Sequence, residues 1–264
     1  MRIRLRLGLL MMGLLLWAAP VQATVDISDG FEYADNTAML NVWSSSCLPS
    51  VTGVIDVSST RAHSGSKSLK VTYPPPDSEG GCFMDRNLSA PTDNFYMRGW
   101  IFLDGFSNNT GVLTKMWFAG QGNSYPNFWS GSFSGAPNWG NVISGDPANG
   151  TNLFGGSIPS GQWVCVEERI SMNTPGVANG VIQHWVNGVL VLDRQNLLLR
   201  NAVLSNFNGP NSQIAFIRTY RQHGVGTIYY DDYAASRDAR IGCSGSIPTA
   251  DTTPPTIPIG LQVR

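Results

Sequence analysis

Residues Gly161 to Leu192, GQWVCVEERISMNTPGVANGVIQHWVNGVLVL, predict two antiparallel strands and their connection. Alternation over residues 163–171 gives one face Val164, Val166, Glu168 and Ile170, and the other face Trp163, Cys165, Glu167, Arg169 and Ser171. Asn173 to Gly176 and Asn179-Gly180 have the composition of turns. Residues 181–186 form the second strand, and Asn187-Gly188 is a strong hairpin signal. The middle of the chain is therefore expected to be an antiparallel meander.

Working outward, further segments alternate in the same way. The clearest is Asn94 to Leu103, in which Phe95, Met97, Ile101 and Leu103 point one way and Tyr96, Arg98, Trp100 and Phe102 the other. Segments 111–120, 212–220 and 227–236 repeat the pattern. Helix signals are weak, because no long segment has apolar residues at positions i, i+3, i+4 and i+7. The length suits one all-β domain.

Both ends of the chain differ from this central part. Residues 1–23 predict a secretory signal peptide: a basic start precedes the apolar run Leu7 to Trp17, and Val21-Gln22-Ala23 resembles a cleavage site. No later stretch is long and apolar enough to cross a membrane. The folded domain is expected over residues 24–246. Residues 247–264 resemble a linker and the truncated start of a fibronectin type III domain.

Charge argues against a nucleic-acid partner. The chain has 17 basic and 18 acidic residues, and 17 minus the three arginines of the signal peptide leaves 14. The mature protein is mildly acidic and contains no basic run, whereas nucleic-acid binding requires a positive surface.

Cysteine usage favours disulfides. Four cysteines in an exported chain allow three connectivities. We favour Cys47–Cys82, which joins neighbouring segments, and Cys165–Cys243, which ties a central strand to the end of the last one. Zinc binding is disfavoured, because the chain has no CxxC motif and its three histidines are scattered.

Several motifs resemble those of a known fold family. They are W-x-C-x-E at 163–167, NTPG at 173–176, WVNG at 185–188, DGFEY at 29–33, HSGSKSLKVTY at 63–73 and IYYDDYAASRDARIGC at 228–243. Together they resemble the concanavalin A-like jelly rolls of secreted polysaccharide lyases and related carbohydrate-binding proteins. The resemblance implies an all-β sandwich of two antiparallel sheets. It is specific for the fold and only weakly specific for activity.

The resemblance also implies a structural calcium ion away from the sugar site. Asp29, Glu32 and Asp232 can supply the hard oxygen ligands that Ca²⁺ prefers. The alternative is that these carboxylates make only local hydrogen bonds.

If one sheet is concave, alternation nominates a groove for an extracellular polysaccharide. Its predicted substrate-binding residues are Tyr96, Trp100, Trp117, Glu167, Arg169, Gln183, Trp185 and Arg218. Aromatic rings stack on sugars, and arginine pairs with a uronate carboxylate. The tryptophans can equally be packing residues.

A lyase also needs a group that neutralises the uronate carboxylate, a base and an acid. Arg98, Arg169 or Arg218 can perform the first role, and Lys115, Tyr220, His184 or His223 the second. Tyrosine or lysine would need a lowered pKa to act as the base. His184 fits a core position better than a base. The predicted catalytic set is Arg98, Lys115, Tyr220 and His223.

These observations predict a secreted or periplasmic, monomeric protein that acts on an acidic polysaccharide by β-elimination. The alternatives are a non-catalytic carbohydrate-binding module and an adhesive or structural surface domain. The sequence does not contain the close carboxylate pair of a retaining glycosidase, a nucleophile elbow, a P-loop or a dinucleotide fingerprint.

Overall fold

The computed structural model describes residues 23–47, 55–73, 82–107, 113–121, 124–133, 138–143, 153–200 and 210–244. The side chains of residues 46–47, 113–157 and 221–222 lie outside this description. So do the predicted fibronectin-like tail and all but the last residue of the predicted signal peptide.

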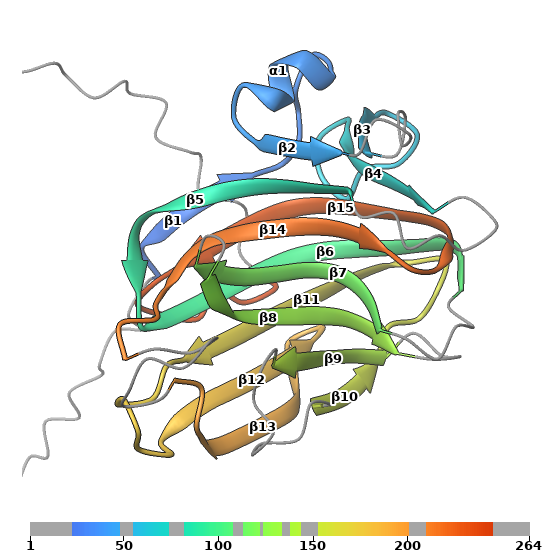
Figure 1. Ribbon diagram of the computed structural model, residues 1–264. Coiled ribbons are helices and arrows are strands. Elements are labelled where there is room, and N and C mark those ends of the chain that lie inside the picture. Colours follow the sequence, from blue (N-terminus) through green and yellow to red (C-terminus); the bar gives the residue numbers. More distant parts are fainter. Residues whose placement is uncertain are drawn as a thin grey trace, which may run out of the picture.

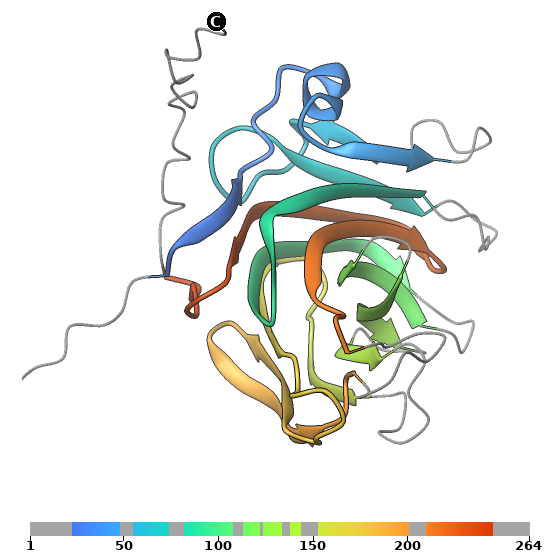
Figure 2. The same cartoon turned by 60° about the vertical axis from the view of Figure 1, so that its left-hand side comes forward.

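The described chain forms two antiparallel sheets that lie face to face (Figure 1). In sheet A the strand order is β13 (Val189–Leu197), β12 (Gly180–Val186), β11 (Trp163–Ser171), β6 (Asn94–Ser107), β15 (Val225–Ser236), β4 (Ser68–Tyr73) and β3 (Ile55–Ser58), with β1 (Val25–Asp29) also pairing with β15. In sheet B the order is β10 (Leu153–Ser157), β9 (Asn138–Ile143), β8 (Ser124–Phe133), β7 (Leu113–Gln121), β14 (Ile214–Gln222), β5 (Cys82–Thr92) and β2 (Ser44–Cys47). One short helix, α1 (Asn36–Leu40), lies near β2 and β3 at one edge (Figure 2). The predicted jelly-roll sandwich is confirmed.

The hydrophobic core fills the space between the sheets. The predicted apolar faces of β6 and β11 both point into it: Phe95, Met97, Ile101, Leu103, Val164, Val166 and Ile170 are buried members of one cluster. His184 is fully buried on the same side, and its Nε2 atom lies 3.8 Å from Oε1 of buried Glu168. The core assignment of His184 is therefore confirmed.

Asp29 at the end of β1 connects the two sheets. Its carboxylate accepts hydrogen bonds from Trp43 Nε1 at 2.7 Å, from Tyr33 Oη at 2.5 Å and from the Phe31 backbone N–H at 2.8 Å. Arg86 on β5 of sheet B donates to the same carboxylate at 2.8 Å. A buried charge needs such partners, since burying it alone is very costly. Asp29 therefore has a structural role.

The segment after β15, residues 237–244, crosses the outer face of sheet A and is here called the C-terminal strap. It is fixed to β11 by the disulfide between Cys165 and Cys243, which confirms the predicted pair. At the other predicted pair, Cys47 stands opposite Cys82 in the β2–β5 register, and Cys82 is disulfide-bonded.

The strap disulfide should contribute measurably to stability. It closes a loop with a sequence separation of 78 residues, and removing a native disulfide from a small secreted domain costs about 2–5 kcal/mol. We expect the double variant Cys165→Ala, Cys243→Ala to have a free energy of unfolding lower by that amount. It should therefore unfold at a lower urea concentration. Equilibrium unfolding in urea checks this, and an unchanged midpoint would contradict it.

Candidate active site

The outer face of sheet B carries a compact group of aromatic and charged side chains. In the β5–β14 pairing Phe83 stands opposite Tyr220, and Asp85 stands opposite Arg218. Directly opposed residues of antiparallel strands point to the same face. These four residues are here called the Phe83 platform.

The side chains of the platform contact one another closely. The rings of Phe83 and Tyr220 are parallel within 4°, with centroids 5.9 Å apart. The guanidinium carbon of Arg218 lies 3.7 Å from the Phe83 ring centroid and 5.2 Å from that of Phe216. Arg218 also forms a two-pronged ion pair with Asp85, through Nε to Oδ1 and through Nη2 to Oδ2 at 2.5 Å. This arrangement combines ring surfaces with a hydroxyl group at the solvent boundary.

Burial sets the protonation of Tyr220. Desolvation raises the pKa of its hydroxyl above the ordinary value of 10, and the positive charge of Arg218 only partly opposes this. Tyr220 therefore keeps its proton at neutral pH. A tyrosine that acts as a base would need a lowered pKa, and Tyr220 has a raised one.

Two other predicted catalytic residues lie near the platform along the chain. On β7 Lys115 stands opposite Gln222, two residues beyond Tyr220. The side chains of Lys115 and Trp117 lie outside the description. A register shift separates Lys115 from Trp117, so simple alternation does not place them on one face. His223 sits in the β14–β15 turn with φ +62° and is only 9% exposed.

The remaining predicted groove residues belong to the other sheet. Tyr96, Arg98, Trp100, Glu167, Arg169, Gln183 and Trp185 lie on β6, β11 and β12 of sheet A. Their side chains point away from the core shared with sheet B. The prediction that they line one groove with Arg218 and Tyr220 is therefore wrong, because the outer faces of a sandwich point in opposite directions.

Arg98 and Glu167 lie beneath the C-terminal strap. Both side chains are completely buried. Glu167 accepts hydrogen bonds from the backbone of Ile241 and Gly242 at 2.8 and 3.0 Å and from Arg240 Nε at 2.6 Å. Arg98 donates to the carbonyls of Gly242 and Asp232 at 3.3 and 3.2 Å. The prediction that Arg98 contacts substrate is wrong for this arrangement, since the strap covers it.

The other predicted residues of sheet A contact each other, a neighbouring loop and the strap. Arg169 donates to Gln183 at 3.1 Å and lies 5.5 Å from the Tyr96 ring. His63 stacks on Trp100 with centroids 3.7 Å apart. Arg240 lies 4.4 Å over the Trp185 ring. Their sugar-binding roles stay predictions.

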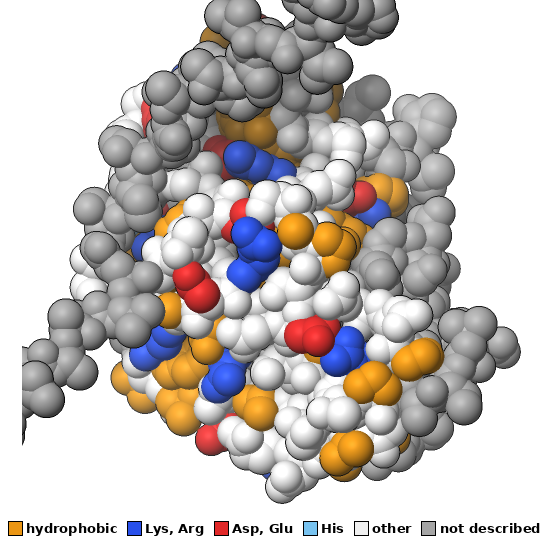
Figure 3. Space-filling view, turned by 90° about the vertical axis from the view of Figure 1, so that its left-hand side faces the viewer, with side chains coloured by type: hydrophobic (Ala, Val, Ile, Leu, Met, Phe, Trp, Pro, Cys, Tyr) orange, Lys and Arg blue, Asp and Glu red, His pale blue; other side chains and the backbone are white. Residues whose placement is uncertain are grey.

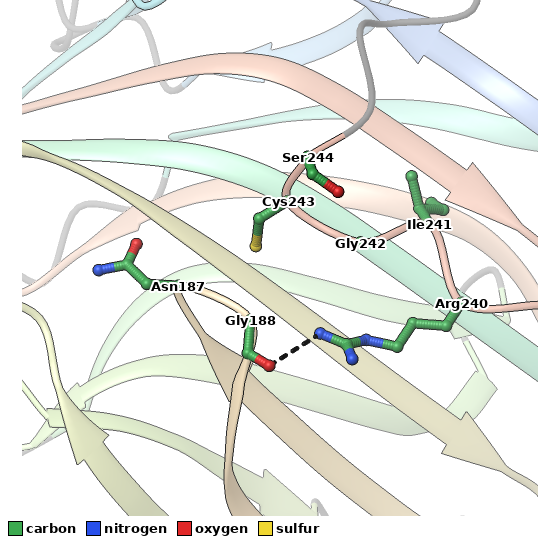
Figure 4. A pocket seen from close by; sticks show the side chains of 7 residues that line it. All are labelled: Asn187, Gly188, Arg240, Ile241, Gly242, Cys243 and Ser244. Carbon is green, nitrogen blue, oxygen red and sulfur yellow. Dashed lines mark hydrogen bonds between the residues drawn. The ribbon is translucent and has the colours of Figure 1, made fainter.

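A shallow pocket of about 350 Å³ lies where the strap meets the β12–β13 turn (Figure 4). It is lined by Asn187, Gly188, Arg240, Ile241, Gly242, Cys243 and Ser244. Arg240 spans it by donating to the Gly188 carbonyl at 3.4 Å. The pocket belongs to the strap and not to the Phe83 platform.

The predicted calcium ligands already make polar contacts with neighbouring residues. Asp29 faces Arg86, as described above, and Asp232 faces His63 Nδ1 at 2.6 Å. Glu32 accepts from Ser66 and from Lys67 N at 2.8 Å, while Lys67 Nζ contacts the carbonyls of Tyr33 and Ala34 at 2.5 and 3.0 Å. Asp29 and Glu32 therefore each have a cation beside them, Arg86 and Lys67, whose positive charge opposes Ca²⁺ binding there. Within the described ranges no three His, Cys, Asp or Glu side chains gather as ligands, and the unfolding experiment described below tests whether calcium binds.

Sequence reasoning missed Phe83 and Asp85. The only available signal was the alternation that starts at Cys82: if the disulfide-bonded Cys82 points inward, then Phe83 and Asp85 point outward.

Charges elsewhere on the surface are mixed. On the face shown in Figure 3, basic and acidic side chains are interspersed.

Comparisons with known proteins support a polysaccharide lyase type of protein. A family model described as polysaccharide lyase 14 matches residues 116–216, less than half of the chain, and the match ends two residues before Arg218. A search among curated proteins found no match.

Solved structures share the fold. The cellulose induced protein Cip1 is 22% identical with a TM-score of 0.56, over 82% of this chain and 99% of that chain. The endo-β-1,4-glucuronan lyase from the fungus Trichoderma reesei is 14% identical with a TM-score of 0.58, over 81% and 95%. The marine PL-14 alginate lyase from Aplysia kurodai is 12% identical with a TM-score of 0.57, over 81% and 100%.

The contacts of Lys67 predict how stability responds to calcium. We expect the wild-type melting temperature to be equal in calcium and in a chelator, because Lys67 already satisfies the two carbonyls. Lys67→Met should lower the free energy of unfolding by about 1 kcal/mol, and Lys70→Met on β4 serves as the control. Thermal unfolding followed by circular dichroism checks both. A calcium-dependent rise in the wild-type melting temperature would show instead that a metal site exists.

Proposed function

We propose that the protein cleaves an acidic, uronate-containing polysaccharide by β-elimination on the outer face of sheet B. The observation that carries this proposal is the Phe83 platform, in which the rings of Phe83 and Tyr220 are parallel and Tyr220 provides a hydroxyl group. The platform lies on sheet B, whose strands β7 to β10 overlap the segment that matches the lyase family model. The family match supports the lyase-like activity, while the uronate specificity is our proposal.

The reaction requires three chemical roles. A base removes the proton from C5 of the uronate, the electron pair forms the C4–C5 double bond, and the C4–O bond breaks. A positive or hydrogen-bonding group neutralises the carboxylate so that the C5 proton becomes acidic. The departing glycosidic oxygen takes a proton from an acid.

Tyr220 suits the acid role. Its raised pKa keeps the hydroxyl protonated at neutral pH, so a proton is present to be transferred to the leaving oxygen. Phe83 supplies a ring surface beside it on which a sugar can stack. We propose Lys115 as the base. It lies on β7, the strand that pairs with β14, and its backbone stands opposite Gln222, two residues beyond Tyr220.

A second candidate function is a carbohydrate-binding module without catalysis. The observation that favours it is the ion pair with Asp85, which already engages two nitrogens of Arg218. The platform then offers stacking and a hydroxyl, as a binding module would.

Export is also part of the proposal. The Cys165–Cys243 disulfide is typical of proteins in oxidising compartments. None of the helices in the described part of the chain has the length and apolarity to span a membrane.

The activity can be tested directly with the full chain. Incubation with alginate, glucuronan, pectate or a glycosaminoglycan should give the ultraviolet absorbance of an unsaturated uronyl product with one of these polymers. Tyr220→Phe should lower the rate by about 10²- to 10⁴-fold, the usual contribution of a general acid or base. Tyr229→Phe, on β15 of sheet A, is the matched control and should retain activity. Equal rates for Tyr220→Phe and wild type would rule out the acid role.

The pH dependence follows from the direction of the Tyr220 shift. An acid must be protonated to act, and its raised pKa extends the protonated form to higher pH. We therefore expect the alkaline loss of kcat/KM attributable to this group to lie above pH 10, the ordinary tyrosine value. A pH profile of kcat/KM measures it. An increase of activity with pH through this range that is absent from Tyr220→Phe would instead indicate that the tyrosinate is the active form.

A further inference from the structure

Arg218 is the basic side chain of the Phe83 platform, and its charge is shared with Asp85. Two of its nitrogens contact the two Asp85 oxygens, and the pair is only 17% and 20% exposed. A two-pronged arginine–carboxylate pair is among the strongest and most directional polar contacts in proteins. Register holds the two residues opposite each other, so no loop movement is needed to form the pair.

The ring contacts restrict Arg218 further. Phe83 lies against the guanidinium at 3.7 Å, and Phe216 lies at 5.2 Å. An approaching sugar carboxylate would have to compete with Asp85 for the edge of the guanidinium, and it would meet the negative charge of Asp85 beside it.

We propose that Asp85 is a specificity-determining residue that withholds Arg218 from substrate carboxylates. The subsite over Phe83 and Tyr220 then takes a sugar unit that presents its C–H face and hydroxyl groups, and the carboxylate of the uronate is bound elsewhere in the groove. This inference rests on the proposed location of the polysaccharide on sheet B.

Asp85→Asn tests the inference because it keeps the shape of the side chain and removes its charge. We would measure binding by calorimetry in a Tyr220→Phe background, which keeps the ring and prevents turnover. The probes are an oligoglucuronate and a cello-oligosaccharide of equal length, each at low and high salt.

We expect the background protein to bind both probes, and its affinities at low and high salt are the reference for each variant. Asp85→Asn should bind the oligoglucuronate about two- to fivefold tighter at low salt, the effect of one exposed ion pair. High salt should remove the gain by screening, and binding of the neutral probe should not change.

Two further variants give the controls. Asp104→Asn breaks a comparable pair, Arg61–Asp104 at 3.2 Å on sheet A, and should have no effect. Phe83→Ala should weaken binding of both probes. Weaker or unchanged oligoglucuronate binding by Asp85→Asn would overturn the proposal, as would a background protein that binds neither probe.

The outcome is separable from that of the proposed function. Binding is read without cleavage, so a wild type that binds the probes but yields no unsaturated product would refute the lyase activity only. A change in the charge preference of Asp85→Asn would still support the role of Asp85.

Discussion

The burial of one face of each sheet against the other is the constraint on which the structure depends. Phe95, Met97, Val164 and Ile170 of sheet A pack in the same cluster as Ile214 and Ile217 of sheet B. Apolar area removed from water stabilises this contact by roughly 25 cal/mol per Å². Each sheet then has one face left for solvent or ligand, and the two free faces point away from each other. A polysaccharide groove can therefore use one set of outward residues but not both.

The outer face of sheet A is largely used for structure. Burying Glu167 and Arg98 would be unfavourable without partners, and the C-terminal strap supplies these through the backbone of Ile241 and Gly242. The disulfide from Cys165 to Cys243 fixes the strap over them. This explains why charged residues with alternating spacing, which predict an open groove, are here inaccessible. Sheet B is left with the Phe83 platform.

The strand faces could be predicted from the sequence, and the sheet membership could not. Period-2 alternation grouped the residues of β6 and β11 that share a face correctly, and the Asn187-Gly188 hairpin correctly paired β12 with β13. Alternation says which residues share a face within one strand. It does not say that β6 pairs with β15 and β11 while β14 lies between β5 and β7, because those pairings join distant segments. The irregularity between Lys115 and Trp117 also leaves no sequence signal.

Charge and protonation at the site depend on the same long-range pairings. From the sequence, Arg218 is a candidate for binding the substrate carboxylate and Tyr220 is a candidate base. In the structure β5 brings Asp85 to Arg218 and Phe83 to Tyr220, so the cation is paired and the hydroxyl is partly desolvated. Desolvation disfavours the tyrosinate more than Arg218 favours it, which suits the acid role that we propose for Tyr220 better than the base role expected from the sequence. The chemistry of the platform is thus set by residues of β5, of which Asp85 lies 133 positions from Arg218 in the chain. Only the pairing of distant strands brings these residues together.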